Sequence, residues 1–147
     1  MRKLLYLLIA MQALVACGNA SNKKTGENRA EEIPADRIEV LYFHGARRCV
    51  TCRAIEANTV ALLDSLYSKE KAEGKIVYKV IDISRKENEA IADKYEVAWS
   101  SLFVNGWKDG KENANNMTGF GFSHAKNAPD KFKEGIKSKI DELLKQL

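Results

Sequence analysis

Residues 38–52 read Ile-Glu-Val-Leu-Tyr-Phe-His-Gly-Ala-Arg-Arg-Cys-Val-Thr-Cys, an apolar run followed by two closely spaced cysteines. The β-branched and aromatic residues over 37–45 predict a strand buried on both faces, and Gly45 marks its end. Residues 49–68 then predict a helix, because apolar and small side chains recur on one stripe, at Ile55, Thr59, Leu62, Leu63 and Leu66. The cysteines Cys49 and Cys52 therefore fall where a buried strand leads into a helix.

The alternation of strand and helix continues along the chain. The further predicted elements are a strand at 75–83, a helix at 85–95, strands at 99–107 and 117–123, and a last helix from about Pro129. Ser84 is the expected cap of the short helix, and Asp109-Gly110 is a hairpin turn signal. The order βαβαββα predicts an α/β fold with a mixed central sheet flanked by helices, in one domain over residues 37–147.

The first residues have the layout of a secretory signal. Arg2 and Lys3 precede an apolar run from Leu4 to Val15. That run is about a dozen residues long, whereas a helix that spans a bilayer needs about twenty. The segment thus predicts export and is too short for a permanent membrane span.

The end of this segment, Leu14-Val15-Ala16-Cys17, resembles a bacterial lipoprotein signal. The resemblance implies cleavage after residue 16 and lipid on Cys17, which would anchor the chain to a membrane of the cell envelope, facing the periplasm or the exterior. Residues 17–36 are polar and small and predict a flexible tether. The alternative is an ordinary secretory peptide cut near residues 18–20, with Cys17 discarded.

Charge and composition narrow the functional classes. The chain has 147 residues, of which 45% are hydrophobic, so it can form a real core. Removal of residues 1–16 takes two of its 24 Lys and Arg residues and leaves all 20 Asp and Glu, which lowers the net charge from +4 to about +2. No clustered basic face is evident, so nucleic acid is not an expected partner.

The spacing of Cys49-Val50-Thr51-Cys52 suits thiol–disulfide exchange. A helix N-terminus stabilises a thiolate, and Arg47 and Arg48 just before it should act in the same direction. Cys49, at the exposed edge, is the expected attacking thiol and Cys52 the resolving one. A purely structural disulfide is the alternative, but a loop of two residues constrains the unfolded chain little.

These residues resemble the thioredoxin-like family over about 37–147, on the segment 40–45, the cysteine pair and Tyr95-Glu96-Val97. More closely, the chain is similar to small lipoprotein thioredoxins, some of them named as subunits of nitroaryl-reduction or arsenic-detoxification systems. The resemblance implies a thioredoxin-like fold and dithiol redox activity on an envelope redox partner or a thiol-containing protein. No cofactor is expected.

The chain departs from this family at three places. Arg48 stands where the family has tryptophan, and Val50-Thr51 where it has Gly-Pro. Tyr42 or Phe43 occupies the position of a buried aspartate. Ser101, or with a shifted gap Leu102, takes the position of a cis-proline opposite the dithiol, and a trans bond is expected there because a non-proline cis bond costs about 3–4 kcal/mol.

Metal or arsenic(III) capture is the competing function. The missing proline leaves the dithiol less shielded, and His44 and His124 could join Cys49 and Cys52 as ligands for zinc or copper(I). Against this, the histidine spacing matches no standard zinc finger. Trp99 and Trp107 are more typical of core or rim packing than of a substrate platform.

Overall fold

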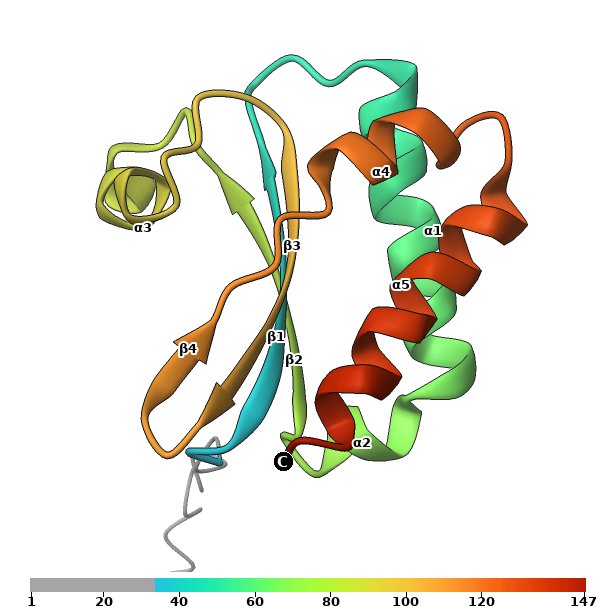
Figure 1. Ribbon diagram of the computed structural model, residues 1–147. Coiled ribbons are helices and arrows are strands. Elements are labelled where there is room, and N and C mark those ends of the chain that lie inside the picture. Colours follow the sequence, from blue (N-terminus) through green and yellow to red (C-terminus); the bar gives the residue numbers. More distant parts are fainter. Residues whose placement is uncertain (1–33) are drawn as a thin grey trace, which may run out of the picture.

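The computed structural model describes residues 34–147 (Figure 1). In this part of the chain, four strands form one mixed sheet in the order β2-β1-β3-β4. The central strand β1 (Arg37–His44) pairs in parallel with β2 (Ile76–Asp82) and antiparallel with β3 (Ser101–Lys108). The short edge strand β4 (Lys111–Asn113) pairs antiparallel with β3. The expected α/β class and mixed sheet are confirmed.

Helices cover the two faces of the sheet unequally. One face carries α1 (Val50–Leu66), α4 (Thr118–His124) and α5 (Pro129–Leu144), and the short α2 (Ser68–Ala72) follows α1 (Figure 1). Within residues 34–147, the opposite face carries only α3 (Glu89–Lys94), at one end of the sheet and preceded by the 3₁₀ turn η1 (Lys86–Asn88). The order of elements is the predicted βαβαββα with α2 and α4 added.

The alternation of side chains along β1 builds two cores. Val40 and Tyr42 point into the large core beneath α1 and α5, and Leu41 and Phe43 point into a smaller one beneath α3. All four are fully buried, so the expectation of a strand buried on both faces is confirmed. The strand that leads to the cysteines is therefore held rigidly from both sides.

The predicted fourth strand at 117–123 is wrong, because these residues form α4. Gly-Phe-Gly-Phe mimics the alternation of a strand, but Phe120 stacks on Phe132 of α5 and Gly121 packs against Ile55 of α1. The fourth strand lies earlier, just after the Asp109-Gly110 turn, where both residues have the positive φ of a tight hairpin.

Other boundaries differ by a few residues. The helix after the second strand is divided into η1 and α3, and Ser84 caps neither of them, since its hydroxyl donates to Asp82. The third strand begins at Ser101 rather than at residue 99. These shifts leave residues 98–100 as a loop beside the end of β1.

The signal segment 1–16, Cys17 and most of the tether lie outside the described residues. Within them, Pro34 lies against Gly74, and Asp36 accepts a hydrogen bond from the backbone of Asp109 at 2.9 Å. No helix in residues 34–147 combines the length and apolarity that a membrane crossing requires.

Candidate functional site

The two predicted cysteines form a disulfide at the N-terminus of α1. Cys49 is the N-cap, in extended conformation, and its Sγ accepts a hydrogen bond from the backbone N–H of Cys52 at 2.9 Å. No acidic side chain occupies the first turn of the helix. The first helical N–H groups therefore direct partial positive charge at the Cys49 sulfur, which favours its thiolate form after reduction.

The two sulfurs differ in accessibility. Cys49 is exposed, whereas Cys52 is only 6% exposed and belongs to the core. The buried Tyr42 of β1 donates its hydroxyl to the Cys52 carbonyl at 2.7 Å, across the interface between strand and helix. This bond holds the first turn of α1 against the sheet, so that Cys49 faces solvent and Cys52 lies behind it.

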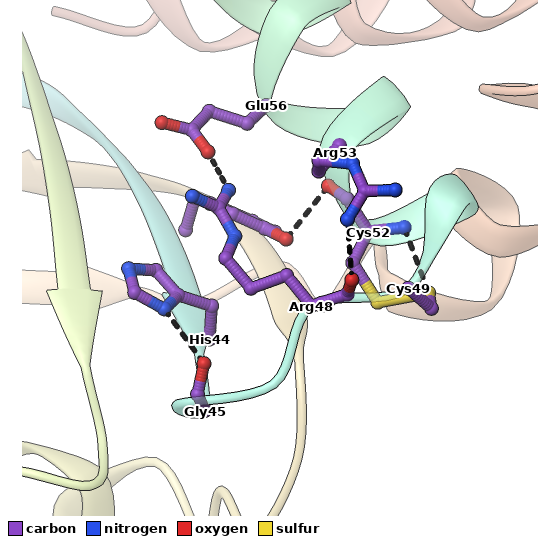
Figure 2. Close-up of a disulfide and its surroundings, with 8 residues drawn as sticks. His44, Gly45, Arg48, Cys49, Cys52, Arg53 and Glu56 are labelled. Carbon is purple, nitrogen blue, oxygen red and sulfur yellow. Dashed lines mark hydrogen bonds and ion pairs between the residues drawn. A yellow bond between two sulfur atoms is a disulfide. The ribbon is translucent and has the colours of Figure 1, made fainter.

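Arg48 lies next to Cys49 in sequence, but its guanidinium is turned away from the disulfide. It forms an ion pair with Glu56 (Figure 2). It also lies over the ring of Tyr42, 5.5 Å from the centroid. The Arg48 carbonyl accepts a hydrogen bond from Arg53 at 2.6 Å. Of the two predicted thiolate-stabilising arginines, Arg47 is the one that lines the space around the cysteines.

A hollow of about 600 Å³ opens at the disulfide, within the size range of ligand pockets. Its lining comes from the loop after β1, the start of α1, the end of β2, the loop before β3, and α4: Gly45, Arg47, Cys49, Cys52, Ile83, Ala98, Trp99, Ser100 and Phe122. The side chain of Trp99 is 69% exposed, so the expectation that it packs in the core or at its rim is wrong.

The positions predicted to lie opposite the dithiol, Ser101 and Leu102, are the first two residues of β3. Ser101 pairs with Phe43 and donates to the Trp99 carbonyl, and Leu102 is fully buried opposite Tyr42. The residue that lines the pocket is their neighbour Ser100. Residues 34–147 contain no cis peptide bond, in agreement with the expected trans geometry.

The sequence patterns do not identify Ser100 and Phe122 as parts of the site and favour a packing role for Trp99. A tryptophan at the very start of the predicted strand 99–107 is the available signal for the loop at 98–100. Nothing comparable identifies Phe122, because it reaches the pocket only through the helix α4, where the Gly-Phe alternation predicted a strand.

The two histidines do not join the cysteines. His44 donates its Nδ1–H to the carbonyl of Gly45 at 3.1 Å, and Figure 2 shows its ring directed away from the sulfurs. His124 donates to the carbonyl of Phe120 and stacks on that ring at 4.6 Å. Within the described residues no three His, Cys, Asp or Glu side chains are grouped to hold a metal ion.

Two titratable groups flank the site without lining the pocket. Burial, with the neighbouring Tyr42, raises the pKa of Tyr78, so this phenol stays neutral at ordinary pH. The hydroxyl and the backbone N–H of Ser84 donate to Asp82 and lower the pKa of that carboxyl. Asp82 is therefore ionised, and its carboxylate already accepts hydrogen bonds from Ser84.

The comparisons with known proteins show no family. No family model matches the chain, and no curated protein matches it. Among solved structures, one described as a malarial protein is similar, with a TM-score of 0.46 and 16% identity over 74% of this chain and 98% of that chain. A likeness of this size carries no argument about function.

Proposed function

We propose that this protein is a thiol–disulfide oxidoreductase that uses Cys49 and Cys52. The carrying observation is the contrast between the two sulfurs: Cys49 is exposed and receives the helix N–H of Cys52, while Cys52 is buried directly behind it. A structural staple needs no such asymmetry and no open hollow beside it. An exchange site needs both.

In the reducing direction, the Cys49 thiolate attacks one sulfur of a substrate disulfide and the other substrate sulfur leaves as a thiolate. Cys52, after loss of its proton, then attacks the Cys49 sulfur of the mixed disulfide and releases the second substrate thiol. The net result is that two electrons pass from the dithiol to the substrate. The reverse sequence oxidises a substrate dithiol.

A thioredoxin-like topology is part of the proposal. It is supported by the parallel β1–α1–β2 unit, by the cysteine pair at the start of α1, and by the antiparallel β3 and β4 followed by a closing helix. Arg48, Tyr42 and Ser101 remain departures from that family, so its redox potential is not carried over to this chain.

The proposed location is the bacterial cell envelope, with the chain anchored through lipid on Cys17. In its support, β1 runs from the end of the sheet where the described chain begins to the end where Cys49 lies (Figure 1). Eight residues in extended conformation place these ends about 25 Å apart. A chain tethered at residue 34 therefore presents the disulfide away from its anchor.

The anchor is tested by labelling cells with a radioactive fatty acid. We expect the wild-type chain to carry label and to sediment with membranes, and Cys17→Ser to be unlabelled and released. Cys49→Ser is the control, because it removes a thiol and leaves the signal intact. Label on Cys17→Ser, or none on the wild type, refutes lipidation at Cys17.

The redox activity is tested by reduction of insulin disulfides with dithiothreitol as electron source. Cys49→Ser should abolish the activity, and Cys52→Ser should leave a trapped mixed disulfide at Cys49 and no turnover. Arg85→Gln, at an exposed position outside the pocket, is the control for general effects of substitution. Activity equal to that of the double-serine variant rules out the proposal.

Capture of a metal or of a trivalent arsenical by the same two thiolates stays a prediction. Anaerobic titration of the reduced protein with Zn(II), Cu(I) or As(III), followed by native mass spectrometry, tests it. His44→Ala and His124→Ala should leave binding unchanged if the two sulfurs act alone, because each ring is already hydrogen-bonded to a backbone carbonyl, that of Gly45 or of Phe120.

A further inference from the structure

We propose that the pocket beside the disulfide selects disulfides that carry carboxylates, and that Arg47 determines this preference. The inference rests on the proposed exchange function and names its substrate class. Among the described residues that line the pocket, Arg47 is the only ionisable one apart from the cysteines. It is exposed, and within the described residues it forms no ion pair.

The surrounding charges favour the same ligand. On α1, the carboxylate of Glu56 is already paired with Arg48, and the cationic Arg53 donates a hydrogen bond to the Arg48 carbonyl. The charge of Arg47 is therefore not compensated by a carboxylate from α1. From β2, Asp82 is bound to Ser84 and lies 3.7 Å from Arg85. From the loop before β3, Glu96 does not reach the pocket lining. The hollow is therefore cationic as well as apolar.

The apolar part of the lining sets the second requirement. Ile83, Ala98, Trp99 and Phe122 surround the disulfide, and the exposed Trp99 and Phe122 bury surface only when something occupies the hollow. A ligand that fits has a disulfide bond, an apolar or peptide body against these side chains, and a carboxylate within reach of Arg47. Its arrival is favoured at low salt, because the Arg47 charge is screened in concentrated salt.

The test uses three small disulfides of different charge: oxidised glutathione, bis(2-hydroxyethyl) disulfide and cystamine. The second-order rate of oxidation of the reduced protein is measured with each. Because intrinsic reactivity differs between them, the quantity compared is the ratio of the glutathione to the cystamine rate, in the wild type and in variants. Arg47→Gln should lower the glutathione rate roughly threefold and raise the cystamine rate, and Arg47→Glu should lower the ratio further.

Lys111→Gln is the matched control. It removes one positive charge from β4, at the end of the sheet far from the disulfide (Figure 1), and should leave the ratio unchanged. A change in thiolate content at Cys49 alters all three rates together and cancels in the ratio. The ratio should also fall as salt is raised from about 20 to 500 mM in the wild type and not in Arg47→Gln.

Two peptide disulfides of equal length, with Glu or Lys beside the cysteine, show whether the carboxylates come from a polypeptide or from a small thiol. A larger fall of the Glu-to-Lys peptide ratio than of the glutathione-to-cystamine ratio on Arg47→Gln identifies a polypeptide, and the reverse identifies a small thiol. Exchange with equal ratios in wild type and Arg47→Gln overturns the inference and leaves the exchange function intact. Exchange with none of the disulfides overturns both.

Discussion

At the scale of single residues, two adjacent arginines have different surroundings. Arg47 lies at the pocket with the cysteines, whereas Arg48 is half-buried between Glu56 and the ring of Tyr42. An ion pair cancels most of the field of a cation at a third group nearby. Adjacency in sequence therefore does not make the two charges equivalent in their effect on Cys49.

We expect Arg47→Gln to shift the alkylation of Cys49 toward higher pH more than Arg48→Gln does. The measurement is the rate of reaction of the reduced protein with iodoacetamide between pH 4 and pH 10, in a Cys52→Ser background so that only Cys49 reacts. A larger displacement in Arg48→Gln than in Arg47→Gln contradicts the arrangement described for the two side chains.

Arg48→Gln should instead reduce stability. It removes the partner of Glu56 and a cation that lies over the Tyr42 ring, and we expect a loss of about 1–2 kcal/mol in urea unfolding of the oxidised protein. Arg47→Gln is the control and should change stability by less than about 0.5 kcal/mol, because Arg47 is exposed. Equal losses of stability in the two variants would contradict a stabilising role for the contacts of Arg48 with Glu56 and Tyr42.

At the scale of elements, the packing of α4 against α5 positions Phe122 at the pocket. Phe120 of α4 stacks on Phe132 of α5, and its ring lies directly over Gly135. A methyl group at residue 135 would overlap that ring. The close approach of the two helices therefore depends on glycine at this position, and the pocket depends on that approach.

We expect Gly135→Ala to destabilise the protein by about 1–2 kcal/mol, because overpacking outweighs the gain of about 1 kcal/mol in helix propensity. Gly119→Ala is the matched control, since an added methyl group there meets nothing within 4 Å and should be neutral or stabilising. Thermal unfolding by circular dichroism measures both variants. A Gly135→Ala protein as stable as wild type shows that Phe120 can move aside.

At the scale of the whole molecule, the sheet face that α3 leaves open is closed by a polar network. Glu39 is buried there and accepts hydrogen bonds from Arg37, Lys79 and the indole of Trp107 at 2.9–3.2 Å. Arg37 and Lys94 each lie 5.0 Å from the centre of the Trp107 ring. Charged side chains thus occupy the place that a covering helix takes on the other face.

This network makes stability depend on pH. Burial disfavours the Glu39 carboxylate, but hydrogen bonds and charge from Arg37 and Lys79 outweigh burial and hold its pKa below the usual 4.5. The stabilisation is therefore complete above the unfolded-state pKa and is lost as the pH falls through the lower folded-state pKa. We expect the urea midpoint to fall in acid below about pH 4.5.

Glu39→Gln should lower stability at pH 7 by about 2 kcal/mol and flatten this acid dependence. Glu134→Gln on α5 is the control, because Glu134 is exposed and forms no ion pair within residues 34–147. Urea unfolding at pH 3, 5 and 7 measures both. An unchanged pH dependence in Glu39→Gln would show that Glu39 is not the cause of the loss of stability in acid.

The parts that could be predicted from sequence are those with a local cause. The strand at 37–45, the helix that follows the cysteines, and the helix from Pro129 follow from side-chain periodicity, and each is found within a residue or two. The prediction of a fourth strand at 117–123 is wrong because alternating Gly and Phe satisfies a period of two, whereas the adjacent Phe120 and Gly121 both pack on helices, Phe120 on α5 and Gly121 on α1.

By itself, then, the sequence determined the α/β class and the cysteine pair at a helix start, because periodicity and spacing along the chain specify both. Only the tertiary structure decided that Arg48 turns to Glu56, that Ser100 rather than Ser101 lines the pocket, that His44 turns away from the sulfurs, and that His124 is held by Phe120. The physical reason is that side-chain direction and charge pairing depend on segments far apart in the chain, which meet only after the sheet and its helices have packed.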